Sequence, residues 1–303
     1  MKALRIHEYG APLQLDQVEA PVAGPGQVIV RNQSTSLNPI DTIRASGVMR
    51  SMFPVAFPWT PGGDVSGTVE AVGDGVTAFQ PGDAVFGYAM AGGAYAELVA
   101  VDEAALALWP VALSVEAGAA VAMVSQTAMQ MLQLAKVSAG QTILIHAGAG
   151  GVGSLAIQIA HNAGVHVITT GQAEQKNALI GLGADRVIDF SKERFEEVAG
   201  EVDAVLDLVG HDTLERSYGI IKHGGTIVTA NQPPDVEQLQ KHGIQGFMVQ
   251  TNVTTQGLND FAEMVKSESV VPLIAHLETL WKPEALWGKR SSGTAVGKIV
   301  FTL

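Results

Sequence analysis

The 303-residue sequence contains no cysteine. Disulfides, a thiolate nucleophile and any zinc site with sulfur ligands are therefore excluded. Histidine and carboxylate ligands are still available for a metal, but the eight histidines are scattered and none shows the paired spacing of a metal-binding helix. We expect a protein without a metal.

Positive charge is also scarce. There are 18 Lys and Arg residues against 30 Asp and Glu, which gives a formal net charge of −12, and no basic cluster offsets it. Nucleic acids and anionic membranes both favour basic surfaces. We therefore expect neither as a partner.

Charge of either sign is almost absent from the middle of the chain, where Lys136 is the only formal charge between Glu116 and Glu174. A long uncharged stretch can be a membrane segment. Here Gln, His and Gly interrupt it, and its periodicity changes from helix to strand to helix, as in a buried α/β core. Residues 1–8 carry charges where a signal peptide would begin its apolar core, so we expect a cytoplasmic protein.

Short strands separated by turns fill the first 113 residues. The expected strands are 2–6, 28–36, 65–72, 84–86 and 95–99, with turns rich in Gly and Pro at 24–26, 61–63 and 81–83. This spacing predicts a compact domain that resembles a β-barrel. Because 303 residues exceed one ordinary domain, a second domain is expected after it.

A different pattern begins at Ser114, which suits the N-cap of a helix over 116–134. Apolar strands then alternate with helical periods, the strands being 142–145, 165–168, 186–188, 204–208 and 226–229. This alternation is typical of a parallel, doubly wound α/β sheet. Residues 297–303 read as a closing strand.

A glycine motif, Gly148-Ala149-Gly150-Gly151-Val152-Gly153, lies between the strand 142–145 and a helix expected over 154–163. In this context it predicts a dinucleotide site. Gly148 would permit the tight turn, Gly150 would let the backbone approach a diphosphate, and Gly153 would let the helix pack closely. The diphosphate would bind the free N–H groups of that helix, which adds Gly151 and Val152 to the cofactor-binding residues.

The second strand of the motif ends in Thr170 and Gly171 without the Asp or Glu that usually selects NAD. A carboxylate 4 Å from a 2′-phosphate would cost about 4 kcal/mol per unit charge at an effective dielectric constant near 20, so its absence permits NADP. Lys176 could supply positive charge, and the Thr170 hydroxyl could supply a hydrogen bond, although Glu174 in the same turn acts against this. NADP is favoured over NAD.

The later strands of the sheet also end in candidate cofactor contacts. Val209 follows the strand 204–208, and Ala230 and Asn231 follow the strand 226–229. Ligands of doubly wound sheets bind at the carboxyl ends of the strands. We expect contacts from the backbone of these three residues.

Four parts of the chain carry a resemblance to a known family. They are Ser36 to Asp41, then Pro61 to Gly67 continuing to 72–73 and 81–83, then His146 to Gly153, and finally Gly297 to Val300. Through them the sequence resembles the medium-chain dehydrogenase/reductase superfamily, in its zinc-free quinone oxidoreductase branch, the relatives of zeta-crystallin.

The resemblance implies a fold and an assembly. A GroES-like catalytic domain, residues 1–115 and 266–303, would enclose a Rossmann domain of residues 116–265, with the cofactor and substrate between them. It also implies a homodimer, and the strand near 247–253 could add to the sheet of a partner.

Zinc-dependent members of the superfamily hold the metal with a Cys near position 38 and a His at the position of Gly63. Asn38 and Gly63 stand there in this sequence, and the four-cysteine structural lobe is missing. Without a Lewis acid, oxidation of an alcohol is disfavoured, whereas an electron-poor quinone or enone can still be reduced. The resemblance therefore implies hydride transfer from NADPH to a quinone or an α,β-unsaturated carbonyl compound.

The resemblance places Asn38 beside the nicotinamide and the substrate, where its amide would stabilise negative charge on a carbonyl oxygen. Read alone, Asn38 before Pro39 is a common turn residue. Thr127 matches a threonine that contacts the nicotinamide ribose or carboxamide, although alone it would be an ordinary helical threonine.

Ile43 and Met49 stand where bacterial relatives carry two tyrosines in the substrate pocket, so a preference for quinone rings is in doubt. Trp59 and Met90 could line the same pocket or belong to the core. Phe190 replaces a tyrosine that helps to hold the 2′-phosphate, which weakens the NADP prediction.

Two other interpretations stay open. An enoyl-thioester reductase would need a basic groove for its substrate, which the acidic composition disfavours. A catalytically idle NADPH-binding protein would show tight cofactor binding without turnover.

Overall fold

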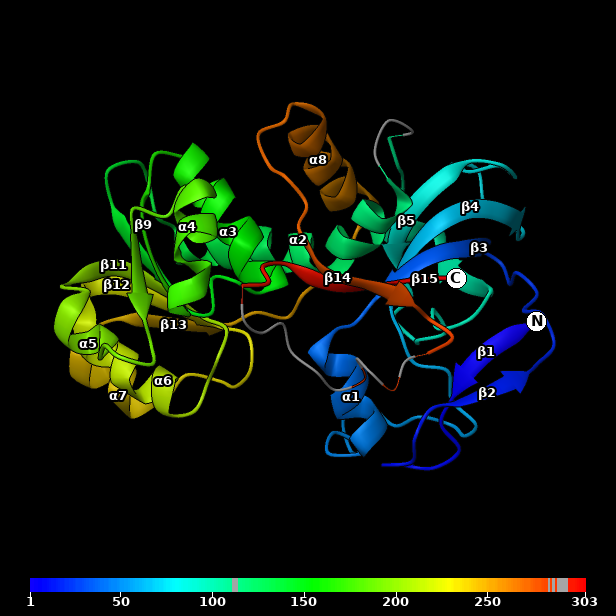
Figure 1. Ribbon diagram of the computed structural model, residues 1–303, viewed down its shortest axis with the longest axis horizontal. Helices are drawn as coiled ribbons and strands as arrows, with labels where there is room; N and C mark the ends of the chain where they lie inside the picture. The colour runs from blue at the N-terminus through cyan, green and yellow to red at the C-terminus, as the bar shows by residue number, and fades with distance from the viewer. Residues whose placement is uncertain (111–113, 283, 285–286, 288–293) are drawn as a thin grey trace.

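The computed structural model describes residues 1–110, 114–282, 284, 287 and 294–303. Figure 1 shows two lobes, one that is built around a mostly antiparallel sheet and contains both chain ends, and one that is built around a parallel sheet. The helix α2 (Val115–Ala135) contacts strands of the first lobe and the helix α3 (Gly151–Asn162) of the second. It therefore joins the two lobes.

The first lobe contains a seven-stranded sheet within the described residues, in the order β14-β15-β3-β4-β5-β7, with β6 paired to β3. Its strands are β3 (Gln27–Ser36), β4 (Asp64–Val72), β5 (Ala84–Tyr88), β6 (Leu98–Asp102), β7 (Leu106–Leu108), β14 (Ile274–Thr279) and β15 (Lys298–Thr302). A two-stranded sheet of β1 (Lys2–Arg5) and β2 (Gln14–Gln17) and the helix α1 (Pro39–Ser46) lie beside it.

The predicted closing strand is confirmed, because β15 pairs antiparallel with β3, with Val300 opposite Ser36. The strand expected over 95–99 was placed too early. Residue Tyr95 is fully buried and Ala96 makes only an isolated bridge to Ala3, so the apolar residues there face the core before β6 begins at Leu98.

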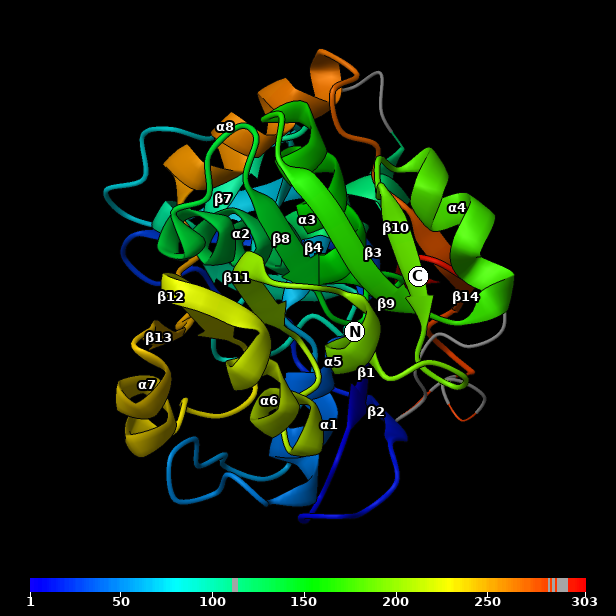
Figure 2. The same cartoon turned by 90° about the vertical axis from the view of Figure 1, so that its left-hand side faces the viewer.

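The second lobe is a parallel sheet in the order β10-β9-β8-β11-β12-β13, seen in Figure 2. Its strands are β8 (Thr142–Ile145), β9 (His166–Gly171), β10 (Arg186–Asp189), β11 (Val202–Asp207), β12 (Ile221–Thr229) and β13 (Gln245–Met248). The connecting helices, besides α3, are α4 (Lys176–Gly181), α5 (Phe195–Val198), α6 (Asp212–Ser217) and α7 (Val236–His242), and α8 (Thr255–Lys266) leads from β13 back to the first lobe. The predicted doubly wound α/β sheet is confirmed.

Burial on both faces explains why β8 is apolar throughout. Ile143 and Ile145 belong to the core shared with α2 and α3, whereas Leu144 belongs to the core on the opposite face, with Phe195. Side chains alternate between faces along a strand, so a strand covered on both faces needs an uninterrupted apolar run.

The helix α2 begins where the sequence predicted, because the Ser114 hydroxyl accepts a hydrogen bond from the Ala117 N–H at 3.2 Å. Small side chains such as Ala119, Ala120 and Ala122 are buried along it, which lets it lie close to both sheets. None of the helices in the described ranges combines the length and apolar character that a membrane span requires.

Candidate cofactor and active site

The carboxyl ends of four parallel strands meet at one edge of the second lobe. Ile145 of β8 is in register with Thr169 of β9 and Leu206 of β11, and Asp207 of β11 with Thr229 of β12. The predicted cofactor residues end or follow these strands and therefore come together at that edge. They are Gly148, Gly150, Gly151, Val152, Gly153, Thr170, Gly171, Val209, Ala230 and Asn231. This is where a doubly wound sheet binds its ligand.

The glycine turn after β8 works differently from the prediction at one position. The residue with positive φ is Ala147, at 55°, and not Gly148. A Cβ on Gly148 would lie 2.1 Å from the Thr169 hydroxyl, so this glycine is needed for close packing on β9. The tight turn itself depends on Ala147.

Gly150 and α3 form a cradle that fits a diphosphate. A Cβ on Gly150 would meet only the Ala147 carbonyl oxygen, at 3.4 Å, so protein packing does not demand glycine there, whereas a ligand approaching the backbone would. The Ser154 N–H is the first in this helix to bond back to Gly150, at 2.9 Å. The N–H groups of Gly151 to Gly153 thus have no acceptor within the helix and are available to an anion.

The Thr170 side chain supports the glycine turn from inside. Its hydroxyl accepts a hydrogen bond from the Ala147 N–H at 3.0 Å and lies 3.4 Å from His146 Nδ1. His146 Nε2 lies 3.0 Å from the Ser217 hydroxyl, which itself donates to the Thr213 carbonyl at 2.7 Å. Ser217 must therefore accept from His146 Nε2–H, which leaves Nδ1 to accept from Thr170. The Thr170 hydroxyl is used inward and does not face a 2′-phosphate.

Burial lowers the pKa of His146 to about 3. The imidazole is neutral, and both ring nitrogens have partners. His146 is a core histidine that supports the turn.

The turn after β11 is organised by Asp207. Its carboxylate accepts hydrogen bonds from the N–H groups of Val209 and Gly210, at 3.0 Å each. Ala230 donates its N–H to the Asp207 carbonyl at 3.0 Å, and Asn231 lies beside Gly210. Burial raises the pKa of Asp207, and the two N–H donors oppose that shift. The structure thus brings the three predicted contact residues together.

The adenosine end of the expected site is more open. Lys176 is exposed at the start of α4. Phe190 is 58% exposed and its N–H donates to the Gly171 carbonyl at 3.3 Å, so these two residues are neighbours. Phe190 therefore lies beside the end of β9, and Lys176 begins the helix that follows this strand.

Thr127 of α2 is buried and its hydroxyl already has two partners. It donates to the Met123 carbonyl at 3.0 Å and lies 2.8 Å from the hydroxyl of Thr251, which follows β13. The pair ties α2 to the edge of the parallel sheet. Thr251 was not predicted, because nothing in its local sequence pattern marks it.

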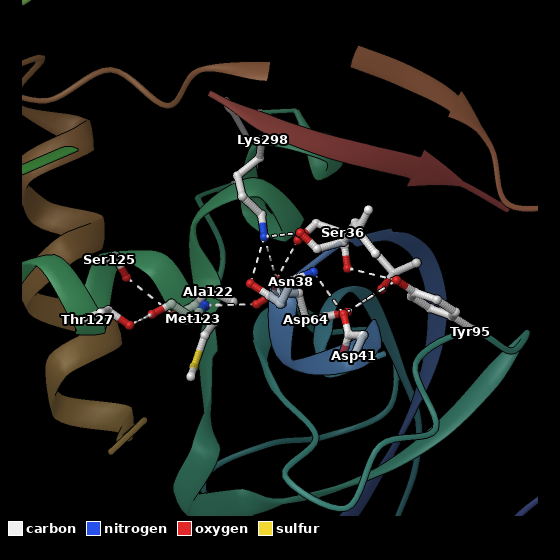
Figure 3. A network of polar contacts seen from close by, with 12 residues as sticks. Ser36, Asn38, Asp41, Asp64, Tyr95, Ala122, Met123, Ser125, Thr127 and Lys298 are labelled. Carbon is white, nitrogen blue, oxygen red and sulfur yellow. Dashed lines mark hydrogen bonds and ion pairs between the residues drawn. The ribbon is translucent and has the colours of Figure 1, made fainter. Parts of the chain in front are cut away.

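The amide of Asn38 is held between two buried charges, as Figure 3 shows. Its Nδ2 donates to the carboxylate of Asp64 at 2.6 Å, and its Oδ1 accepts from the ammonium of Lys298 at 2.7 Å. Asp64 also accepts from the Ser36 hydroxyl and, at 2.8 Å, from the Met123 N–H. Three hydrogen-bond donors surround this carboxylate, and the ammonium of Lys298 lies 3.6 Å from it.

A second buried carboxylate lies beneath Asn38. Asp41 accepts a hydrogen bond from the Asn38 backbone N–H at 2.8 Å, and the Tyr95 hydroxyl lies 3.4 Å from the same oxygen. Asn38 is also the N-cap residue of α1. It therefore serves both as the turn residue that starts this helix and as part of the side-chain network. Burial raises the pKa of Asp41 to about 7, an effect that the Asn38 N–H opposes.

Two of the predicted substrate-pocket residues, Trp59 and Met90, contact Arg44, which the sequence analysis missed. Arg44 lies 4.8 Å above the Trp59 ring and donates to the Met90 carbonyl at 3.1 Å. Trp59 is 9% exposed, whereas Ile43 on the same helix as Arg44 is 37% and Met90 is 58% exposed. Met49, in the turn after α1, is half-buried. Trp59 is therefore largely a core residue, while Ile43 and Met90 present apolar surface.

Asp64 and Lys298 were also missed as site residues, although both lie in segments that carried the resemblance. A signal was present, because each is a charged residue that begins a largely buried strand, and such residues are rarely buried without a partner. Within the described ranges, no group of three or more His, Cys, Asp and Glu side chains is placed to hold a metal ion.

Comparisons with known proteins agree with this architecture. Residues 24–111 match the alcohol dehydrogenase GroES-like domain, and residues 151–266 match the family described as zinc-binding dehydrogenase. The quinone oxidoreductase of Sus scrofa is 33% identical over 249 residues, covering 78% of this chain and 75% of that protein.

The chloroplastic NADPH-dependent alkenal/one oxidoreductase of Arabidopsis thaliana is 33% identical over 287 residues, covering 89% of this chain and 72% of that protein. The crystal structure of Escherichia coli quinone oxidoreductase complexed with NADPH superposes with a TM-score of 0.91 at 25% identity, covering 100% of both chains. The chain belongs to the quinone oxidoreductase branch of the medium-chain dehydrogenase/reductase superfamily.

Proposed function

We propose that this protein is an NADPH-dependent, zinc-independent reductase that transfers hydride to a quinone or to the β-carbon of an α,β-unsaturated carbonyl compound. The relatives named as quinone and NADPH-dependent alkenal/one oxidoreductases support the reaction class. One observation in the structure carries the proposal, namely the Asn38 amide held by Lys298 and Asp64.

The chain's own residues bind and orient the reactants. The first N–H groups of α3 hold the diphosphate of the cofactor, and the turns after β9, β11 and β12 hold its remaining parts. NADPH supplies the hydride when it is bound. Lys176 supplies the positive charge for the 2′-phosphate.

Asn38 stabilises the substrate oxygen. The Nδ2 group carries two hydrogens, and Asp64 takes one of them, so the second is available to a carbonyl oxygen on which negative charge develops. The apolar surface of Ile43, Met49 and Met90 would pack against the substrate ring or chain. The proton that completes the reduction comes from solvent or from a ribose hydroxyl of the cofactor.

The ammonium of Lys298 takes the place of a catalytic metal. The ammonium of Lys298 lies 2.7 Å from Asn38 and 3.6 Å from Asp64, so a cation already neutralises the carboxylate there. Metal analysis of the purified protein and assays after treatment with a chelator test this point. We expect unchanged turnover after chelation.

We also propose the domain division of residues 1–115 with 266–303 and residues 116–265, because β14 and β15 complete the sheet of the first lobe. A cytoplasmic homodimer completes the proposal. The strand β13 supports the dimer, since among the described residues it is an edge strand of the parallel sheet with no strand on its outer side.

Steady-state assays with NADPH and NADH against a quinone, a small enone and an enoyl thioester test the function. We expect turnover of the quinone or the enone with NADPH, and little with the thioester. Asn38→Ala should lower kcat by about 100-fold, the cost of removing one oxyanion donor. Failure of the wild-type protein to oxidise either cofactor would sink the proposal, and tight NADPH binding with no turnover would favour an idle binding protein.

A further inference from the structure

Lys298 is only 5% exposed, although lysine is rarely buried. Its ammonium donates to the carbonyl of Leu37 and to Asn38 Oδ1, both at 2.7 Å, and Asp64 lies 3.6 Å away. Burial lowers the pKa of Lys298, while the carboxylates of Asp64 and Asp41 act in the opposite direction. The three hydrogens of the ammonium therefore face three oxygen atoms.

This geometry fixes the orientation of the Asn38 amide. An ammonium can only donate, so the atom of Asn38 that faces Lys298 must be the oxygen. The nitrogen then faces Asp64, whose other neighbours are the donors Ser36 and Met123. Lys298 and Asp64 together allow one of the two amide orientations and exclude the other.

The stem of Lys298 also reaches the glycine turn. A Cβ on Gly151 would lie 2.6 Å from Lys298 Cδ, and the neighbouring Gly297 donates its N–H to the Ala149 carbonyl at 2.9 Å. Lys298 thus lies between the expected diphosphate cradle and the Asn38 amide.

We propose that Lys298 is the positioning residue for the reductase reaction, and that it acts through Asn38. By holding Oδ1 it directs Nδ2 to Asp64 and to the substrate oxygen, and it polarises the amide so that the remaining N–H becomes a stronger donor. This inference rests on the proposed function of Asn38.

A simpler role would be compensation of the Asp64 charge alone. The two roles differ in what happens when both charges are removed. If Lys298 only compensates Asp64, neutralising both residues restores a stable and active protein. If Lys298 positions Asn38 together with Asp64, neutralising both restores stability but not turnover.

The experiment compares three variants. The first carries Lys298→Met alone, and the second carries Asp64→Asn and Lys298→Met together. The third adds Asn38→Ala to the second. Lys298→Met leaves a buried carboxylate without its cation and is expected to lower the melting temperature or prevent folding. The Asp64→Asn, Lys298→Met variant should recover the melting temperature to within a few degrees while its kcat is at least 10-fold below wild type. Its KM for the acceptor and its Kd for NADPH should change less than 3-fold.

Adding Asn38→Ala to that variant should lower kcat by less than a further 3-fold, because residues acting through one another are not additive. Lys222→Met is the matched control, since Lys222 pairs with Asp203 on the surface at 2.9 Å, and it should leave kcat unchanged. Wild-type kcat in the doubly neutralised variant, or an independent loss from Asn38→Ala, overturns the inference.

A spectroscopic readout separates this inference from the proposed function. With asparagine labelled by 15N, the side-chain signals of Asn38 are identified by their loss in Asn38→Ala. We expect them to shift or broaden in the doubly neutralised variant without cofactor, compared with Lys222→Met. Unchanged Asn38 signals would refute positioning by Lys298, whereas an inactive wild-type protein would refute the proposed function.

Discussion

The stem of Lys298 occupies the space that a side chain on Gly151 would need. An ideal Cβ on Gly151 would lie 2.6 Å from Cδ and 2.9 Å from Cγ of Lys298. The stem cannot move aside freely, because its ammonium is held by Leu37, Asn38 and Asp64. The glycine motif is thus constrained by the proposed active site as well as by the cofactor.

We expect Gly151→Ala to destabilise the protein by about 1–3 kcal/mol, the usual cost of inserting a methyl group into a packed site. It should also lower kcat, because displacing the Lys298 stem disturbs the Asn38 amide. Urea unfolding and steady-state kinetics measure both effects. Wild-type stability together with wild-type kcat would show that the stem can yield.

Gly150→Ala should weaken cofactor binding while changing the stability of the protein little. Gly150 has φ −74° and ψ 171°, which alanine adopts readily, and its Cβ would meet only one protein atom, at 3.4 Å. We expect the free energy of unfolding to fall by no more than about 1 kcal/mol, the cost of replacing Gly at an N-cap by Ala, which is a poor N-cap residue. The Kd for NADPH, measured by fluorescence titration, should rise at least tenfold. Unaltered affinity would place the diphosphate elsewhere.

Thr170→Val removes the acceptor for the Ala147 N–H and leaves this group unpaired at the glycine turn. An unsatisfied buried donor costs about 1–3 kcal/mol, so both the melting temperature and the affinity for NADPH should fall. Thr170→Ser keeps the hydroxyl and serves as the control. If Val and Ser behave alike, the hydroxyl does not support the turn.

Asp41 should make stability depend on pH in an unusual direction. Because its pKa in the folded protein is raised to about 7, the folded state binds more protons than the unfolded state between about pH 4 and pH 7. This contribution to stability is present at low pH and is lost as pH rises to 7. Asp41→Asn lacks the effect, so relative to wild type it should gain about 2–3 kcal/mol in unfolding free energy between pH 5 and pH 8. Parallel stability curves for the two proteins would contradict the raised pKa.

Lys176→Ala tests the choice of cofactor. Loss of its charge should weaken NADPH binding by about tenfold, the scale of a charge-assisted contact, and should leave NADH binding unchanged. Lys266→Ala, at the end of α8, is the control. Equal effects on NADPH and NADH would remove Lys176 from the 2′-phosphate site.

The cofactor edge could be predicted from the sequence because its signals are local. The motif 148–153 follows shortly after β8, and Thr170, Val209 and Ala230 lie close to the ends of their strands. The hydrophobic periodicity and the turn residues along the chain are sufficient to place such residues at one edge of a sheet.

The network around Asn38 could not be predicted in the same way. Asp64 is 26 residues and Lys298 is 260 residues from Asn38, and no periodic pattern links residues so far apart. The hydrogen bonds that the Thr170 and Thr127 hydroxyls make inside the protein could not be predicted from the sequence either. Sequence pattern placed these two residues on the right elements, but only packing determines the partner of a hydroxyl group.

The pairing of β15 with β3 has a consequence for synthesis of the protein. During translation, residues 27–36 leave the ribosome long before residues 298–302, and the whole parallel sheet is made in between. Until then residues 34–36 of β3 lack the strand they pair with, and the cation that lies beside Asp64 has not been made. The nascent first lobe therefore exposes an unpaired strand end and an uncompensated acid until β15 is made, which happens only after the whole parallel lobe has been translated.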